Sequence, residues 1–113
     1  MEFIEAPAFT RYLSEYMDDK GYRALQKELA RKPEAGDVIP GTGGFRKVRW
    51  SDIRRGKGRR GGLRVIYYHF AAEHQIWLMT LYSKNETADL TASEKKMLKA
   101  AIEWECAARR RKQ

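Results

Sequence analysis

Three consecutive segments between residues 45 and 82 have the composition of β-strands, and they constrain the fold more than any other feature of the chain. Residues 45–50 alternate, so Phe45, Lys47 and Arg49 are expected on one face of a strand, opposite Arg46, Val48 and Trp50. Residues 63–70 and 75–82 are rich in β-branched and aromatic side chains. The short polar connection at 72–74 predicts that these two segments form a hairpin.

Helical patterns precede the three strands. Pro7 suits the first turn of a helix, and apolar residues follow it at the spacing of one helical face: Phe9, Tyr12, Leu13 and Tyr16. Asp18 and Asp19 can cap a second helix, which would bury Tyr22, Leu25 and Leu29 and end before Pro33. Residues 3 and 4 predict a short opening strand, and the proline and glycine content of residues 33–44 predicts a loop.

A helix is also expected at the C-terminal end of the sequence. Thr91 and Glu94 have the spacing of a capping box. The apolar face of this helix would carry Met97, Leu98, Ala101 and Ile102, with the basic run 109–112 lying past its end. The predicted order is therefore β-α-α-β-β-β-α, an α+β domain with helices packed on a small, antiparallel-rich sheet.

The composition predicts one domain that binds a polyanion. At 113 residues the chain is too short for two cores, so residues 1–113 are expected to form a single domain. The net charge is +8, and nine of the 23 Lys and Arg residues lie between positions 41 and 68, against one acidic residue. Such a surface attracts phosphate-rich partners. It could instead serve solubility alone.

Several classes of protein are disfavoured by the same sequence. One cysteine, Cys106, excludes an internal disulfide and a cysteine-based zinc site, and it is expected to pack as a small residue on the last helix. No cluster of His, Asp and Glu has metal-ligand spacing, so no cofactor is expected. The N-terminal residues do not resemble a secretory signal, and no apolar run reaches membrane-spanning length. A cytoplasmic protein without membrane contact is expected.

Three blocks of sequence, in this order and spacing, resemble a known family. They are GTGGFRKVR at 41–49, GKGRRGGLRVIYY at 56–68 and LYSKNExxDL at 81–90. Together they are similar to the RelE/HigB class of bacterial toxins, and most similar to its HigB branch. The flanking helices fit the same RelE-like layout. Without the resemblance, composition and pattern indicate only a basic α+β domain that binds RNA.

The resemblance implies the toxin of a type II toxin–antitoxin pair. Such toxins are ribosome-dependent mRNA endonucleases that use the ribose 2′-OH to attack the adjacent phosphate without a metal ion. The implied partners are the ribosome, mRNA and a cognate antitoxin, typically a HigA-like helix-turn-helix protein. Operator DNA would be bound only through that antitoxin.

The family's catalytic cations correspond to four positions here. Lys47 and Arg49 come from the first basic strand, Arg64 opens the next strand, and Lys84 follows the last one. The reaction needs a base for the 2′-OH, positive charge on the phosphate and an acid for the leaving oxygen. A lysine could serve as base or acid where neighbouring cations lower its pKa. Each of these residues could also be an ordinary exposed or turn-forming residue.

A second set of residues is expected to contact RNA or the ribosome. It comprises Arg46, Arg54, Arg55, Lys57, Arg59, Arg60, Tyr68 and Tyr82. Tyr67 and Tyr68 alternate faces, so one should be buried and the other available to stack on a base. Many family members carry a tyrosine just after the last strand. Residues 87–90 contain none, and Tyr82 could replace it or could belong to the core.

Other side chains leave alternatives open. Glu86 could orient a cation, Asp89 could lead into the cap of the last helix, and either could be a carboxylate base. His69 and His74 have the chemistry of an acid–base pair but are expected at a hairpin end, away from the basic strand. A binding module of the same fold that has lost its cleavage activity, and an unrelated RNA-binding protein, remain alternative functions.

Overall fold

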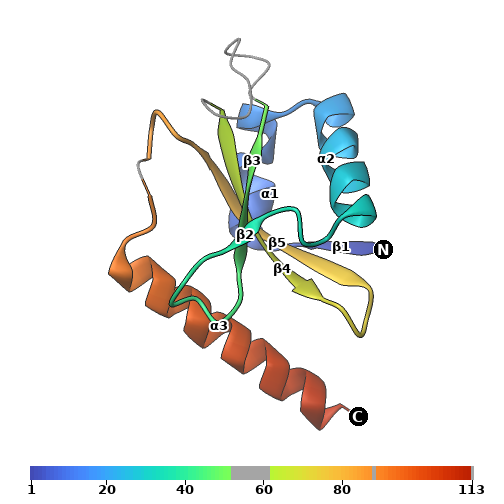
Figure 1. Ribbon diagram of the computed structural model, residues 1–113, viewed down its shortest axis with the longest axis vertical. Coiled ribbons are helices and arrows are strands. Elements are labelled where there is room, and N and C mark those ends of the chain that lie inside the picture. Colours follow the sequence, from blue (N-terminus) through green and yellow to red (C-terminus); the bar gives the residue numbers. More distant parts are fainter. Residues whose placement is uncertain (52–61, 88, 113) are drawn as a thin grey trace.

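The computed structural model describes residues 1–51, 62–87 and 89–112, and it has α+β architecture (Figure 1). Its strands and helices follow in the order β1 (Glu2–Glu5), α1 (Pro7–Tyr16), α2 (Asp19–Arg31), β2 (Asp37–Val38), β3 (Arg46–Trp50), β4 (Leu63–Phe70), β5 (Gln75–Ser83) and α3 (Ala92–Arg111). The predicted opening strand, the first two helices and the β4–β5 hairpin are confirmed.

The strands form one mixed sheet in the order β1-β5-β4-β3-β2. β1 runs parallel to β5, and the other three pairs are antiparallel. The predicted order contained four strands, whereas the described residues contain five, because β2 lies inside the segment predicted as a loop. β2 has only two residues. It is a strand because it pairs with Arg46 and Lys47, and its own sequence has no strand pattern.

The helices begin where the sequence predicts them to begin. Asp18 caps α2, because its carboxylate accepts a hydrogen bond of 2.7 Å from the Gly21 amide. At α3 the Thr91 hydroxyl accepts from the Glu94 amide, at 3.1 Å. The Glu94 carboxylate in return accepts from the Thr91 amide, at 2.8 Å. The predicted capping box is therefore confirmed, and it fixes where the segment between β5 and α3 ends.

The C-terminal basic run does not lie past the end of α3, as predicted, but inside the helix, which continues to Arg111. Arg109 explains the extension. Its guanidinium lies 3.7 Å from the centre of the Phe70 ring, donates to the Gln75 side chain at 2.7 Å, and pairs with Glu105 one turn earlier at 2.9 Å. These contacts anchor the last turns of α3 to the β4–β5 hairpin.

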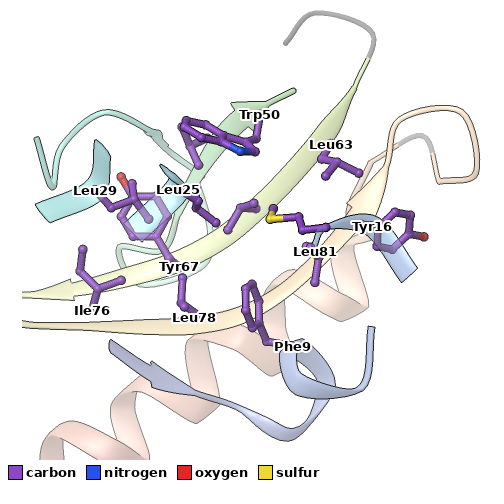
Figure 2. Close-up of a cluster of buried hydrophobic side chains, with 13 residues drawn as sticks. Phe9, Tyr16, Leu25, Leu29, Trp50, Leu63, Tyr67, Ile76, Leu78 and Leu81 are labelled. Carbon is purple, nitrogen blue, oxygen red and sulfur yellow. The ribbon is translucent and has the colours of Figure 1, made fainter. Parts of the chain in front are cut away.

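Two apolar clusters cover the two faces of the sheet. The first joins α1 and α2 to the sheet, and Figure 2 shows Leu25 and Leu29 beside Tyr67 and Phe9 near Leu78. The second lies under α3 and includes Phe45, Ile66 and Ile102. The domain therefore has three layers, with α1 and α2 on one face of the sheet and α3 on the other.

Met97 was predicted on the buried face of α3 but is 69% exposed. The side of α3 that packs on the sheet carries Leu98, Ile102 and Cys106, so Met97 points outward. Cys106 packs against this cluster, in agreement with its expected role. The bond from Thr91 to Glu94 starts the helix but does not determine which side of it faces the sheet.

Tyr67 ties the segment before β2 to the sheet. Its buried hydroxyl donates to the carbonyl of Pro33 at 2.6 Å and accepts from the amide of Gly36 at 2.9 Å. Gly36 is close enough to the Lys47 backbone that a Cβ would lie 2.9 Å from it. This packing holds residues 35–40 against β3, where they form one wall of the groove described below.

Candidate nucleic-acid interface

Two arginines lie directly opposite each other near the end of β3 and the start of β4. Arg49 of β3 pairs with Arg64 of β4, and Arg64 pairs with Tyr82 of β5. Cross-strand partners project from the same face of a sheet, so the three side chains form a row across three strands. They share the face on which α3 packs elsewhere. Two like charges directly opposite each other are unusual in a sheet, because their repulsion disfavours the strand pairing.

A groove of about 530 Å³ lies beside this row, at the β3 edge of the sheet. Three cations line it, Lys47, Arg49 and Lys95, and we call it the basic groove. Two carboxylates, Asp37 and Asp89, are also part of its lining, and its remaining walls are Ala35, Val38, Ile39, Pro40 and Val48. The structure thus brings Lys47 and Arg49 together, as their i, i+2 spacing predicts.

Asp89 is the ionic partner of Lys47 across the groove. The Lys47 ammonium lies 3.7 Å from the Asp89 carboxylate. The pKa of Asp89 is lowered, chiefly because its carboxylate accepts a 2.8 Å hydrogen bond from the Leu90 amide and also because Lys47 and Lys95 lie near it. The ion pair thus joins β3 to the segment that leads into α3, across the groove.

Arg64 is the most buried of the predicted catalytic cations, with 6% of its surface exposed. Its guanidinium donates to the carbonyl of Leu63 at 3.4 Å, and its charge partly offsets the rise that burial causes in the pKa of the neighbouring Tyr82. A buried guanidinium is held in one orientation by its surroundings. Arg64 therefore has the properties of a fixed electrostatic group rather than of a mobile surface residue.

Tyr82 is also buried, with 9% of its surface exposed, and belongs to the cluster under α3. Among the described residues its hydroxyl finds no hydrogen-bond partner. Burial raises the pKa of Tyr82, the carboxylate of Asp89 raises it further, and Arg64 opposes the rise. The hydroxyl therefore stays protonated at neutral pH and remains able to donate a hydrogen bond.

Lys84 and Glu86 lie in the exposed turn that follows β5. The Lys84 amide donates to the carbonyl of Gly62 at 3.2 Å, which places Lys84 beside the start of β4. Lys84 follows Tyr82 by two residues, so it lies close to the Arg64–Tyr82 pair. Lys84 does not line the basic groove. Glu86 accepts a hydrogen bond of 3.0 Å from the Tyr16 hydroxyl, which links this turn to α1.

Besides Tyr82, two residues of the predicted RNA-contacting set have contacts within the fold. Arg46 lies on the opposite face of β3 from Lys47, and its guanidinium donates to the Gly36 carbonyl at 2.8 Å. Tyr68 is half-buried, with its ring 5.4 Å from that of Phe45 and 4.7 Å from that of Phe70. One member of the tyrosine pair was predicted to be buried, and it is Tyr67.

The remaining predicted contacts, Arg54, Arg55, Lys57, Arg59 and Arg60, fall outside the described residues. The histidines lie away from the groove. The His69 imidazole is 4.0 Å from the Glu34 carboxylate, and His74 sits in the hairpin turn with a positive φ of 53°. Within residues 1–51, 62–87 and 89–112, no group of three or more His, Cys, Asp and Glu side chains could hold a metal ion.

Lys95 is a groove residue that the sequence patterns did not predict. It belongs to the first turns of α3 and reaches the groove only because the capping box places that end of the helix beside β3. Its position directly after the capping box is the one signal that could have identified it. The role of Asp89 as the partner of Lys47 depends on contacts between segments 42 residues apart, for which the sequence carries no signal.

A scan of the chain against protein-family models finds no match. Across the described parts of the chain, no helix has both the length and the apolar character needed to cross a membrane. The features that bear on function are the row of Arg49, Arg64 and Tyr82 and the basic groove beside it.

Proposed function

We propose that this protein is a RelE/HigB-like toxin that cleaves mRNA on the ribosome. The observation that carries the proposal is that Arg49 and Arg64 are cross-strand neighbours on one sheet face, which concentrates positive charge at one place beside the basic groove. The basic groove adds Lys47 and Lys95 to the same region. A bridging phosphate of an RNA strand has the charge and the size that suit this arrangement.

The cleavage step that these residues suit uses the RNA's own 2′-hydroxyl. Its oxygen forms a bond to the adjacent phosphorus while the bond from phosphorus to the 5′-oxygen of the next nucleotide breaks. A base accepts the 2′-OH proton, an acid protonates the departing 5′-oxygen, and a 2′,3′-cyclic phosphate is left. The nucleophile comes from the substrate, so the protein's part is to hold the strand and stabilise charge.

In the proposed reaction Arg64 is the principal group that stabilises the pentavalent phosphate, because it is buried and held in place. Arg49 contacts the same phosphate from the neighbouring strand. Lys47, which lines the groove beside Asp89, holds the strand there. Tyr82 and Lys84 are the candidates for proton transfer at the other end of the row, since Tyr82 pairs with Arg64 and the Lys84 amide bonds to Gly62, just before β4.

The proposal includes the partners that such a toxin requires. They are the ribosome, mRNA and a cognate HigA-like antitoxin with a helix-turn-helix domain, which would bind operator DNA. The site of action is the bacterial cytoplasm. The net charge of +8 supports binding to ribosomal RNA as well as to the acidic surface that an antitoxin would need.

One observation favours a second candidate, a ribosome- or RNA-binding module of the same fold that does not cleave. Lys47 is engaged in an ion pair with Asp89, and Lys84 does not line the groove, so neither lysine is placed as a free base on the groove side. A phosphate-binding role needs only charge. The two candidates differ in whether bound RNA is cut.

Induced expression of variants in growing bacteria tests the proposal. We expect Arg64→Ala and Lys84→Ala each to remove most of the growth arrest that the wild-type chain causes, while thermal unfolding of the purified proteins stays cooperative. Arg64→Gln is a second variant in case truncation to alanine unfolds the protein. Full growth arrest by folded Arg64→Ala and Arg64→Gln proteins would show that the assigned site is wrong.

A further inference from the structure

The outward face of α3 carries two large exposed apolar side chains. Met97 is 69% exposed and Trp104 is 71% exposed. They are seven residues apart, so they lie two turns apart on the same side of the helix. The opposite side, with Leu98, Ile102 and Cys106, packs on the sheet. α3 is therefore apolar on a side that the sheet leaves uncovered. Figure 1 shows the helix running along one side of the domain.

The pattern of this outward face suits another helix better than a flat surface. Alanines lie between and beside the two large residues, at positions 100, 101, 107 and 108. Large residues at a seven-residue interval with small residues between them form the seam of a helix pair, in which the alanines let the two backbones approach closely. Arg111, one further heptad on, lies over the Trp104 ring with 6.0 Å between its guanidinium carbon and the ring centre.

The flanking charges identify the partner helix as a second copy of α3. Lys96 and Glu103 each precede one of the two large residues, so both lie along the same flank of the seam. They have opposite signs. In an antiparallel pair the same flanks meet, and Lys96 of each copy faces Glu103 of the other. In a parallel pair these charges would face Ala101 and Ala108 instead, with no ionic partner.

We propose that the protein forms a two-fold symmetric dimer through an antiparallel pairing of α3 helices, with Met97 and Trp104 in the seam and two Lys96–Glu103 pairs on its flank. A two-fold axis makes each contact occur twice, so one charge pair in the sequence gives two in the dimer. Glu105, on the other flank, is bound by Arg109 of its own helix. The inference does not depend on the proposed function.

Sedimentation equilibrium of the purified chain tests the dimer, at protein concentrations from about 1 μM to about 500 μM, because association follows mass action. We expect a monomer–dimer equilibrium in the wild-type chain. Trp104→Glu should abolish it, and Lys96→Glu should raise the dissociation constant about tenfold or more by placing like charges opposite each other. Val38→Glu, which charges a residue that is 52% exposed on β2, is the matched control and should leave the equilibrium unchanged.

The charge-swapped variant Lys96→Glu/Glu103→Lys decides the orientation of the helices. The two residues remain complementary in an antiparallel pair after the exchange, so this variant should recover the wild-type dissociation constant. A wild-type chain that stays monomeric over the whole concentration range would overturn the proposal. So would a dimer that survives Trp104→Glu, and a double variant no tighter than Lys96→Glu would rule out the antiparallel pairing.

Discussion

Arg49 on β3 and Arg64 on β4 are direct cross-strand neighbours, so two guanidinium groups project side by side from one face of the sheet. Arg64 is buried and Arg49 is exposed, and Arg49 also lines the basic groove. Arg64 is thus a buried charge that lies next to Arg49, and Arg49 is accessible from the groove. The predictions below test this relationship and the packing that supports it.

Arg49→Ala should weaken RNA binding and make it less sensitive to salt. Each Lys or Arg that neutralises a phosphate contributes about 0.7 to the slope of log affinity against log salt for a single strand, so the slope should fall by about that amount. The measurement is fluorescence anisotropy of a labelled single-stranded RNA across a salt series. Arg23→Ala, an exposed arginine on α2, is the matched control. Equal losses in the two variants would contradict a localised groove.

Tyr82→Phe separates a structural role of this residue from a functional one. The hydroxyl is buried and has no hydrogen-bond partner among the described residues, so removing its oxygen should leave the free energy of unfolding unchanged or slightly higher. Cleavage should nevertheless fall if the hydroxyl donates to the substrate. Urea unfolding and a cleavage assay on the same preparation measure both effects. Unchanged cleavage would assign Tyr82 to the core alone.

Asp89→Asn should change how stability depends on pH. The lowered pKa of Asp89 means that its carboxylate stabilises the folded state above its ordinary value of 3.8. This contribution is lost as pH falls through the lower folded-state pKa. Asparagine keeps an oxygen to accept from the Leu90 amide but loses the charge that faces Lys47.

Thermal unfolding across the acid range checks this prediction. Wild type and Asp89→Asn should have similar unfolding temperatures at the acid end, and the wild type should be modestly more stable near neutral pH. The difference should be small, because the Asp89 side chain is 60% exposed and water screens the pair. A larger difference at the acid end than at neutral pH would contradict the assigned contact.

Tyr67→Phe should destabilise the domain by about 1–3 kcal/mol, because it leaves the buried Gly36 amide and the Pro33 carbonyl without the tyrosine hydroxyl. Urea unfolding measures the loss, and Tyr12→Phe, an exposed tyrosine on α1, is the control. Because residues 35–40 form a wall of the groove, RNA affinity should fall as well. Equal stability of the two variants would show that these hydrogen bonds contribute little.

The sequence predicts the elements of this fold well where a local signal exists. Asp18 and the Thr91–Glu94 box mark helix starts through hydrogen bonds made within one turn, and both are confirmed. The alternation at residues 45–50 correctly places Lys47 and Arg49 on one face. β2, by contrast, exists only through its pairing with β3, and the helical end of α3 depends on Arg109 meeting Phe70. Such contacts join distant segments and leave no local pattern.

The candidate site shows the same division. Lys47, Arg49 and Arg64 follow from strand positions, whereas Asp89 and Lys95 enter the groove through the path of the chain between β5 and α3. The burial of Arg64 has no signal in its immediate neighbours, because a basic residue at the start of a strand is usually exposed. Arg64 was chosen as a candidate because of its motif match to RelE/HigB toxins. Its position opposite Arg49 is a separate, structural reason to consider it as a phosphate-binding residue.

Primer extension on a defined message tests the central claim most directly, with translated message from bacteria that express the protein compared with the same RNA purified and incubated with the protein. The account predicts cuts at codon-registered positions on the translated message and none on naked RNA. Growth arrest without any cuts would contradict cleavage and support the non-cleaving binder. Equal cutting of naked RNA would contradict dependence on the ribosome.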